Sequence, residues 1–262
     1  MRTYVIPLML LGAATAAAQS PAASTAKPED TEIWTPVPRV VDAGPGPRTP
    51  APPPADAIVL FDGGSLSEWT DADGGAAGWR VADGMLTVHK PAGDIQTRRR
   101  FTNYQLHLEY RVPPGLHETG QERGNSGLFL AGTRGAGGGY ELQILDSYRN
   151  ETYVNGQAAS IYKQNPPLVN ASRPPGEWQT YDVVWTAPTF AADSSLRTPA
   201  YVTVLHNGVL VQDHFALRGE TMYRGTPAYG PPHGASPIRL QAHGDPSPPL
   251  SFRNIWVREL RN

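Results

Sequence analysis

Carboxylate, imidazole and amide side chains, the groups that bind sugar hydroxyls and move protons, recur at alternate positions of expected strands. Within residues 140–145, Glu141 and Gln143 alternate with the apolar Leu142 and Ile144. Successive side chains of a strand point to opposite faces, so the polar pair lies on the face away from the core. Glu and Gln are poor strand formers but good partners for hydroxyls. This face is therefore a predicted ligand site.

Two further segments, residues 104–110 and 238–243, show the same alternation. Their apolar positions form an expected core face, and their polar positions place more site-type groups on the opposite face. The polar residues assigned to the ligand-binding face are His107, Glu109, Gln241 and His243. A single polar strand face is usually only solvated, but three strands that share such residues favour a site.

Other candidates come from the segments between these strands. Asn125, which enters the next expected strand, and Gln143 can hydrogen-bond hydroxyl or carbonyl groups of a ligand. The ring of Tyr162 suits stacking on a pyranose, because an aromatic face accepts the axial C–H groups of a sugar. Arg123 and Lys163 are cationic candidates for the same site.

From Ala57 onward the sequence consists of short alternating runs bounded by turn residues. Asp83-Gly84 and Asn207-Gly208 separate paired runs and favour tight hairpin turns, since both residue types tolerate positive φ. No segment has a sustained helical period. We therefore predict an all-β fold, an antiparallel two-sheet β-sandwich of jelly-roll type.

The N-terminal part of the chain predicts export. Residues 1–18 combine Arg2, a short apolar run and Ala16-Ala17-Ala18, as in a cleavable signal peptide. Residues 19–56 are a Pro-rich extension in which the patch around Trp34 is expected to dock on the domain. Residues 57–262 form the predicted domain, and the mature protein is expected to be periplasmic or secreted.

The composition excludes several classes of protein. Gly and Pro contribute 27 residues each of 262, which disfavours a mainly helical chain. A net charge of −2 gives no electrostatic footprint for nucleic acid. The chain has no Cys, so disulfides, thiolate metal sites, a cysteine nucleophile and a lipoprotein anchor are all excluded. No apolar stretch is long enough for a membrane span or anchor, and the oligomeric state is left open.

The segment from Glu141 to Asp146 invites comparison with retaining β-glucanases, which carry acidic residues in an E-x-D-x-x-E arrangement. Here Gln143 replaces the middle acid, and Asp146 falls on the opposite face of a regular strand. A retaining mechanism needs two carboxyl groups about 5 Å apart, which this strand does not supply. Ordinary glycosidase chemistry is therefore disfavoured here.

A series of short motifs in a fixed order carries a family resemblance. They are Leu60-Phe61-Asp62-Gly63, Trp69, Asn125-Ser126-Gly127, the run 140–146, Ala159-Ser160-Ile161-Tyr162, Pro175-Gly176-Glu177-Trp178, Asn207-Gly208, Leu240-Gln241-Ala242-His243-Gly244 and Phe252-Arg253-Asn254-Ile255. Together, over residues 58–260, they resemble the DUF1080 family, also called 3-keto-disaccharide hydrolases. The resemblance implies a concanavalin A-like jelly roll, export, and action on 3-keto-glycosides.

A ketone at C3 of a sugar acidifies the hydrogen at C2, so a base can form an enolate that expels the aglycone from C1 before water adds. This reaction needs a base near C2 and an electrophile near the C3 oxygen. We expect Glu141 as first choice for base or metal ligand, and His243 as base, proton donor or metal ligand. His107 and Glu109 are expected to form a supporting pair or a metal site, and Arg123 or Lys163 to stabilise the enolate.

A divalent cation such as Ca²⁺ or Mg²⁺ would suit carboxylate ligands and polarise the C3 carbonyl, although no metal motif of fixed spacing is present. No organic cofactor is expected. The expected partner is a small-molecule or oligosaccharide substrate. Two alternatives stay open on the same fold: a non-catalytic carbohydrate-binding module, and an ordinary glycoside hydrolase. A structural adhesion domain is disfavoured by the many site-type polar residues.

Overall fold

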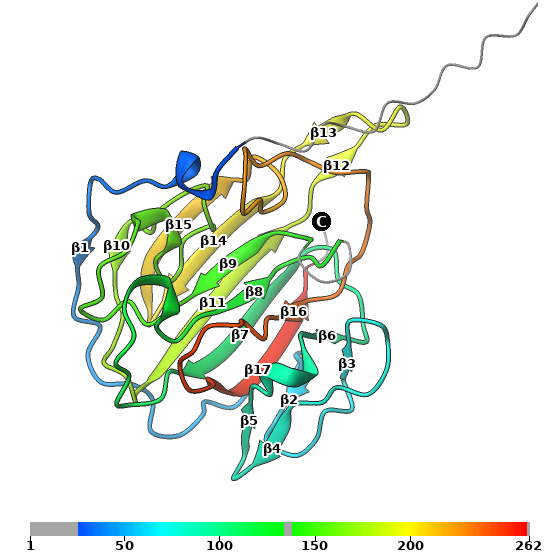
Figure 1. Cartoon of the computed structure of the whole chain (residues 1–262). Coiled ribbons are helices and arrows are strands. Elements are labelled where there is room, and N and C mark those ends of the chain that lie inside the picture. Colours follow the sequence, from blue (N-terminus) through cyan, green and yellow to red (C-terminus); the bar gives the residue numbers. More distant parts are fainter. Residues whose placement is uncertain (1–25, 134–137, 261–262) are drawn as a thin grey trace, which may run out of the picture.

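Two antiparallel sheets form the body of the protein. The computed structural model describes residues 26–133 and 138–260 (Figure 1). The larger sheet has eight strands, in the order β15 (Val209–Ala216), β14 (Tyr201–His206), β11 (Trp178–Thr186), β7 (Tyr104–Arg111), β17 (Ser251–Glu259), β5 (Met85–Thr87) and β4 (Arg80–Ala82), with β2 (Ile58–Phe61) also paired to β17. The smaller sheet has five, in the order β3 (Trp69–Asp71), β6 (Ile95–Thr97), β16 (Arg239–Leu240), β8 (Ser126–Phe129) and β9 (Glu141–Ile144).

The apolar positions of the alternating segments fill the space between the two sheets. Leu106 and Leu108 of β7 are fully buried in the same core cluster as Leu142 and Ile144 of β9. One face of each strand is therefore committed to the core, and the polar residues between these positions face outward. The predicted all-β, two-sheet antiparallel sandwich is confirmed.

The two predicted hairpin turns are confirmed. Asp83 and Gly84 have φ angles of 52° and 71° between β4 and β5, and Asn207 and Gly208 have 56° and 79° between β14 and β15. These positive φ angles are the reason for the Asp-Gly and Asn-Gly pairs, because other side chains are strained there. One element differs from expectation. The segment expected as a strand over 238–243 is a strand only at Arg239–Leu240, so Gln241 and His243 lie beyond its end.

Short elements complete the described chain. They are the 3-10 helices η1 (Pro28–Thr31), η2 (Lys90–Ala92), η3 (Gly120–Glu122) and η4 (Val154–Gly156), the parallel pair β1 (Arg39–Val40) and β10 (Val169–Asn170), and the pair β12 (Thr189–Phe190) and β13 (Leu196–Thr198). Across residues 26–133 and 138–260, none of the helices has the length and hydropathy needed to cross a bilayer.

The Pro-rich segment before the domain runs along its surface from η1 to β2 (Figure 1). The Trp34 ring lies 6.1 Å from the Tyr153 ring, edge to face, and Trp34 is 52% exposed. Arg253 donates to the carbonyl of Pro47, and Arg258 forms an ion pair with Asp56. A Pro-rich segment cannot pair all its backbone carbonyls internally, so side chains of the domain donate hydrogen bonds to them instead. The predicted signal peptide, residues 1–18, lies outside the described residues.

Candidate active site

The outer face of the five-stranded sheet carries the candidate site. In the register of β8 and β9, Phe129 lies opposite Glu141, and Gly127 lies opposite Gln143. A Cβ atom on Gly127 would lie only 2.5 Å from Glu141 Oε1. The Glu141 carboxyl group therefore extends across β8 over a position where only glycine leaves room.

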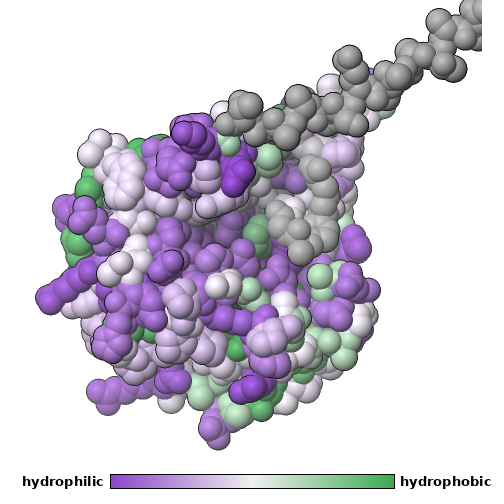
Figure 2. Space-filling view, viewed as in Figure 1, coloured by the Kyte–Doolittle hydropathy of each residue, from purple (hydrophilic) through white to green (hydrophobic). Residues whose placement is uncertain are grey.

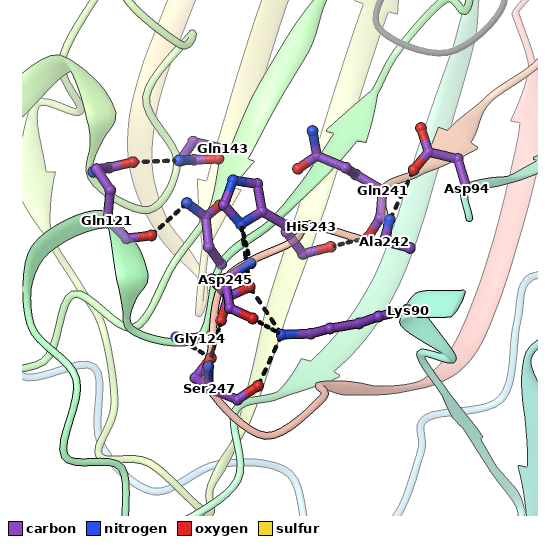
Figure 3. A network of polar contacts seen from close by, with 12 residues as sticks. Lys90, Asp94, Gln121, Gly124, Gln143, Gln241, Ala242, His243, Asp245 and Ser247 are labelled. Atoms are coloured by element: carbon purple, nitrogen blue, oxygen red, sulfur yellow. Dashed lines mark hydrogen bonds and ion pairs between the residues drawn. The ribbon is translucent and has the colours of Figure 1, made fainter. Parts of the chain in front are cut away.

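Gln241 and His243 join the same face from the other side of β8. The backbone N–H of Gln241 donates to the carbonyl of Gly127 at 2.9 Å, so Gln241 follows β8 past the end of β16. Figure 3 shows the His243 ring on this face, between the side chains of Gln143 and Gln241. Figure 2, in the view of Figure 1, shows a hydrophilic hollow at the position of β8 and β9.

The Glu141 carboxyl group is held in its protonated form at neutral pH. Glu141 is 6% exposed, and burial raises its pKa to about 8; Arg239 opposes this rise and Asp94 adds to it. Its backbone is fixed on both sides, because its N–H donates to Thr221 Oγ1 and its carbonyl accepts from the N–H of Tyr162. A carboxyl group in this state can donate a proton near pH 7.

Arg239 provides a buried cation on the same face. It is 1% exposed, its guanidinium lies 4.1 Å from the centre of the Phe129 ring, and its Nε is 3.4 Å from Asp94 Oδ2. Burial lowers the pKa of Arg239, while Asp94 and Glu141 oppose that shift. A guanidinium stays charged in proteins, so this one lowers the cost of negative charge that develops above β8 and β16.

His243 is held by a buried carboxylate. Its Nδ1 lies 3.1 Å from Asp245 Oδ2, and the Asp245 side chain is completely buried (Figure 3). Lys90, on η2, forms an ion pair with the same oxygen at 3.1 Å, and the Ser247 hydroxyl donates to the other oxygen. Burial disfavours the ionised form, but the bonds from His243, Ser247 and Lys90 outweigh it and hold the pKa of Asp245 below its usual value.

Two contacts at Nδ1 of His243 correspond to the two tautomers of its neutral ring. The backbone N–H of Asp245 can donate to Nδ1 at 3.1 Å, and a protonated Nδ1 can donate to Asp245 Oδ2. In the second state Nε2 is a base, and after it takes a proton the imidazolium keeps its bond to the carboxylate. Figure 3 shows the other ring nitrogen turned away from Asp245, towards the space between Gln143 and Gln241.

Amide groups line the space around this histidine. Gln143 Nε2 donates to Gln121 Oε1 at 3.0 Å (Figure 3). Asn125 Nδ2 donates to the Gln121 carbonyl at 2.7 Å. Within the described residues, the buried side-chain oxygens of Gln143 and Gln241 have no hydrogen-bond partner. Buried polar atoms are rarely left unpaired, so these two acceptors are positioned for hydroxyl groups of a ligand.

Tyr162 lies beside the site, whereas Lys163 is committed to the N-terminal segment. Burial raises the pKa of Tyr162 to about 12; its bond with Tyr153 opposes the shift and the nearby Glu141 adds to it. Lys163 Nζ donates to the carbonyls of Pro28 and Tyr223. The cationic role expected for Lys163 at an enolate is therefore replaced by a structural one.

Arg123 is also committed elsewhere. Its Nε lies 2.7 Å from Asp146 Oδ2, and its Nη2 donates to the Tyr148 carbonyl. The cation on the site face is Arg239 instead, which the sequence analysis did not select. Arg239 stands two residues before Gln241. Because alternate residues of a strand share a face, this spacing could have placed Arg239 on the face of Gln241.

His107 and Glu109 do not share the face of Glu141, which corrects the sequence-based expectation. Both lie on β7, in the eight-stranded sheet, with side chains on its outer side. His107 contacts Asp182 at 2.7 Å, and Glu109 Oε2 accepts from Arg253 at 2.6 Å. Alternation placed them correctly outside the core, but it could not tell which of two outer faces they occupy.

The residues that the sequence analysis missed are joined to the site only by the fold. Lys90 and Asp94 come from the connection between β5 and β6, Gln121 lies on η3, and Asp245 follows His243 in a loop. In the described part of the chain, no three His, Cys, Asp or Glu side chains group closely enough to hold a metal ion. The Ca²⁺ or Mg²⁺ site therefore stays a prediction, and the proposed reaction uses no metal cation.

Comparison with known proteins agrees with this fold. A solved structure from Parabacteroides distasonis ATCC 8503, described as a candidate glycosyl hydrolase, is 50% identical, with a TM-score of 0.76 over 94% of this chain and 100% of that one. A second from the same organism is 20% identical, with a TM-score of 0.58 over 78% of this chain and 94% of its own, and shares the fold.

The 3-keto-disaccharide hydrolase of Bacteroides thetaiotaomicron is 24% identical over 248 residues, 79% of this chain and 80% of that protein. The family description that matches residues 56–258 is the 3-keto-alpha-glucoside-1,2-lyase-like domain. That match includes β2 and nearly all of β17, and hence both sheets of the sandwich. The chain therefore belongs to the family of 3-keto-alpha-glucoside-1,2-lyase-like domains, the 3-keto-disaccharide hydrolase family, whose members are enzymes.

Proposed function

We propose that this protein cleaves 3-keto-glycosides by removal of the C2 proton, elimination of the aglycone and addition of water. The observation that carries the proposal is the pairing, on one polar face, of a buried carboxyl group at Glu141 with an imidazole held by Asp245. These are two proton-transfer groups of different character, as a reaction with separate base and acid steps requires.

In the first step, Nε2 of His243 takes the proton from C2, and the electron pair forms an enolate whose charge rests on the C3 oxygen. Asp245 stabilises the imidazolium through Nδ1. The charge of Arg239 on the same face lowers the energy of the enolate. Sequence alone favoured Glu141 as base, but a carboxyl group that is protonated at neutral pH fits the acid role better.

In the second step, the enolate re-forms the C3 carbonyl, a C1–C2 double bond forms and the C1–O bond breaks. Glu141 gives its proton to the departing aglycone oxygen and becomes a carboxylate. Water then adds to C1 with Glu141 as base, and the His243 imidazolium returns a proton to C2. The products are the free aglycone and a 3-keto-sugar, and both catalytic groups regain their initial protonation states.

The unpartnered acceptors explain how a substrate would be held. Gln143 and Gln241 each offer a buried side-chain oxygen, on either side of the His243 ring. Hydroxyl groups of the sugar would satisfy both, which fixes the ring relative to His243. An analogue that lacks these hydroxyls leaves two buried acceptors unpaired and should bind more weakly.

The test is to incubate the mature protein with a 3-keto-disaccharide and with its unoxidised parent, in D₂O. We expect sugar release from the oxidised substrate only, with deuterium at C2 of the product at early times, above the level that 3-keto-sugar acquires without enzyme. Release of sugar from neither substrate would refute the proposal. Comparable release from the parent would indicate an ordinary glycoside hydrolase.

We further propose that the protein is exported to the periplasm or medium. The support is the sequence of residues 1–18, with its basic start, apolar run and small residues. Expression in a Gram-negative host, followed by fractionation and N-terminal sequencing, tests it. A mature N-terminus near Gln19 in the periplasmic fraction or medium is expected, and an intact chain retained in the cytoplasm would contradict it.

A further inference from the structure

A second pocket lies between the N-terminal segment and the domain, and Gln121, which accepts from Gln143, also donates to Thr152 Oγ1 in its wall. Its volume is about 940 Å³, and its walls are residues 37–45 on one side and residues 147–152 and 170–177 on the other. None of the residues assigned above to catalysis or substrate binding lines it. Its volume is at the upper end of the roughly 300–1,000 Å³ of small-molecule sites.

We propose that this pocket binds a neutral oligosaccharide of about three sugar units, as a site separate from the catalytic face. Sugars are recognised by planar polar side chains that bond their hydroxyls and by an aromatic ring that contacts their C–H groups. The pocket offers both kinds of group. Its wall includes the Tyr148 ring, the amide of Gln157 and the hydroxyl of Ser172.

Two buried acceptors in the wall have nothing to bond. Gln157 is 5% exposed, and within the described residues its Oε1 has no hydrogen-bond partner. The same holds for the Oγ of Ser172, which follows β10 on another side of the pocket. Buried polar atoms are normally paired, so both groups are expected to turn to hydroxyls of an occupant.

The charges of the pocket favour a neutral ligand over an anionic one. Three carboxylates, from Asp42, Glu151 and Glu177, line it against two guanidinium groups. Arg173 is already used, because it donates to the carbonyls of Gly44 and Trp178. The pocket therefore lacks the cluster of available cations that phosphate or uronate groups need.

The pocket is preformed by contacts of the N-terminal segment with the domain. The N–H of Val41 donates to the Asn170 carbonyl at 2.9 Å, beside the β1–β10 pair, and the N–H of Gly46 donates to Glu177 Oε2 at 3.3 Å. A preformed pocket loses little entropy on binding. The Pro-rich segment thus has a reason to be ordered that catalysis does not supply.

The test measures binding of maltotriose, cellotriose and laminaritriose to the full mature protein by isothermal titration and saturation-transfer NMR. These sugars carry no keto group, so the result does not depend on the proposed reaction. We expect at least one to bind, and Tyr148→Ala and Gln157→Leu each to weaken binding about tenfold or more. Turnover of a 3-keto-disaccharide should not change in either variant.

Tyr148 is half-buried with the Arg149 guanidinium over one face of its ring. Tyr201→Ala is the matched control, because Tyr201 is half-buried and stacked against His214 but does not line the pocket. Its binding should equal that of the wild type. Ser172→Ala removes only one hydroxyl and replaces Gln157→Leu if that variant fails to fold. The proposal is overturned if none of the three sugars binds, if the control loses binding equally, or if Gln241→Leu on the catalytic face abolishes it.

Discussion

The outer faces of the two sheets carry nearly the same residue types, but only one is arranged as a reactive site. On the eight-stranded sheet, His107 is bonded to Asp182 on one side and lies 3.8 Å from Glu109 on the other. Both oxygens of Glu109 are used, by Asn254 and Arg253. Arg253 and Asn254 also bond carbonyls of the N-terminal segment, which lies over this face.

On the five-stranded sheet, the corresponding groups keep capacity to bond something else. Glu141 is protonated at neutral pH because it is buried, and two neighbouring amide oxygens have no partner within the described residues. His243 has a carboxylate on one nitrogen only. The difference teaches that the identity of the polar residues does not mark the site, whereas their unused hydrogen-bonding capacity does.

The largest expected effect separates the two faces directly. Glu141→Gln removes the proposed acid and should lower kcat on a 3-keto-disaccharide by about 10²–10⁴-fold. Glu109→Gln, the matched change on the other face, should leave kcat within about twofold. Steady-state kinetics of both variants, with thermal melts to verify folding, provide the measurement. Similar losses in the two variants would remove the distinction between the faces.

Asp245→Asn tests the support of His243. The amide cannot stabilise an imidazolium as a carboxylate does, so kcat should fall about 10–100-fold and the shape of its pH profile should change. The measurement is the pH profile of kcat. Because Lys90 also loses its ion pair, a purely structural role would lower the melting temperature and leave the shape of the profile unchanged.

Gly127→Ala tests the placement of the acid. The new methyl group would lie 2.5 Å from Glu141 Oε1, so the carboxyl group must move off β8. We expect kcat to fall about tenfold, with KM changed less, because the proton donor is misplaced while the amide oxygens remain. Thermal melts of Gly127→Ala verify that the strand is still folded. Unchanged kinetics in Gly127→Ala would contradict the geometry.

On the outer face of the eight-stranded sheet, the expected effects concern the stability of the fold. Glu109→Gln weakens the bonds of a side chain that is 2% exposed, and the free energy of unfolding should fall by about 1–3 kcal/mol. Urea denaturation of the wild type and the variant measures it. An unchanged midpoint would mean that the Glu109 network does not hold the N-terminal segment as described.

The smallest expected effect is a pH dependence of the free energy of unfolding that arises from His107 on the eight-stranded sheet. Burial lowers the pKa of His107, but bonds with Asp182 and Glu109 outweigh it and raise the value from 6.5 to about 9. The folded state therefore holds this proton more tightly. The stabilisation is complete below pH 6.5 and is lost as the pH rises through 9, by at most roughly 3 kcal/mol.

Urea denaturation across that range, for the wild type and His107→Gln, isolates this contribution, since Glu141 titrates in both proteins. If the free energy of unfolding of His107→Gln changes with pH as steeply as that of the wild type, the pH dependence belongs to another group. On the catalytic face the expected readout is different. There kcat/KM should fall as the pH rises through about 8, because Glu141 loses the proton that it must donate.

Alternation along single strands was enough to identify part of the candidate site. It separated Glu141 and Gln143 from Leu142 and Ile144, because the two faces of a strand differ in every residue. It also set Gln241 apart from Leu240. The same rule selected His107 and Glu109, which lie on the other sheet. A period of two separates side chains that face the core from those that face outward, but it does not tell which sheet they belong to.

The remaining site residues depend on contacts between distant segments. Asp245 matters because a loop after β16 returns its carboxylate to His243, and Lys90 reaches that carboxylate from a segment more than 150 residues earlier. Arg123 and Lys163 looked like available cations, but Asp146 and the carbonyl of Pro28 bind them. The sequence does not show which partner a charged side chain has, and that partner determines whether the charge is available to a substrate.

The sequence by itself determined the all-β sandwich, its hairpin turns and the polar strand faces, because these follow from local backbone preferences and a period of two. Tertiary structure alone decided which polar face is hollow, which acid is buried and protonated, and which histidine is held by a carboxylate. Burial and pairing are properties of surroundings assembled from the whole chain, and they set the proton affinity on which the proposed chemistry depends.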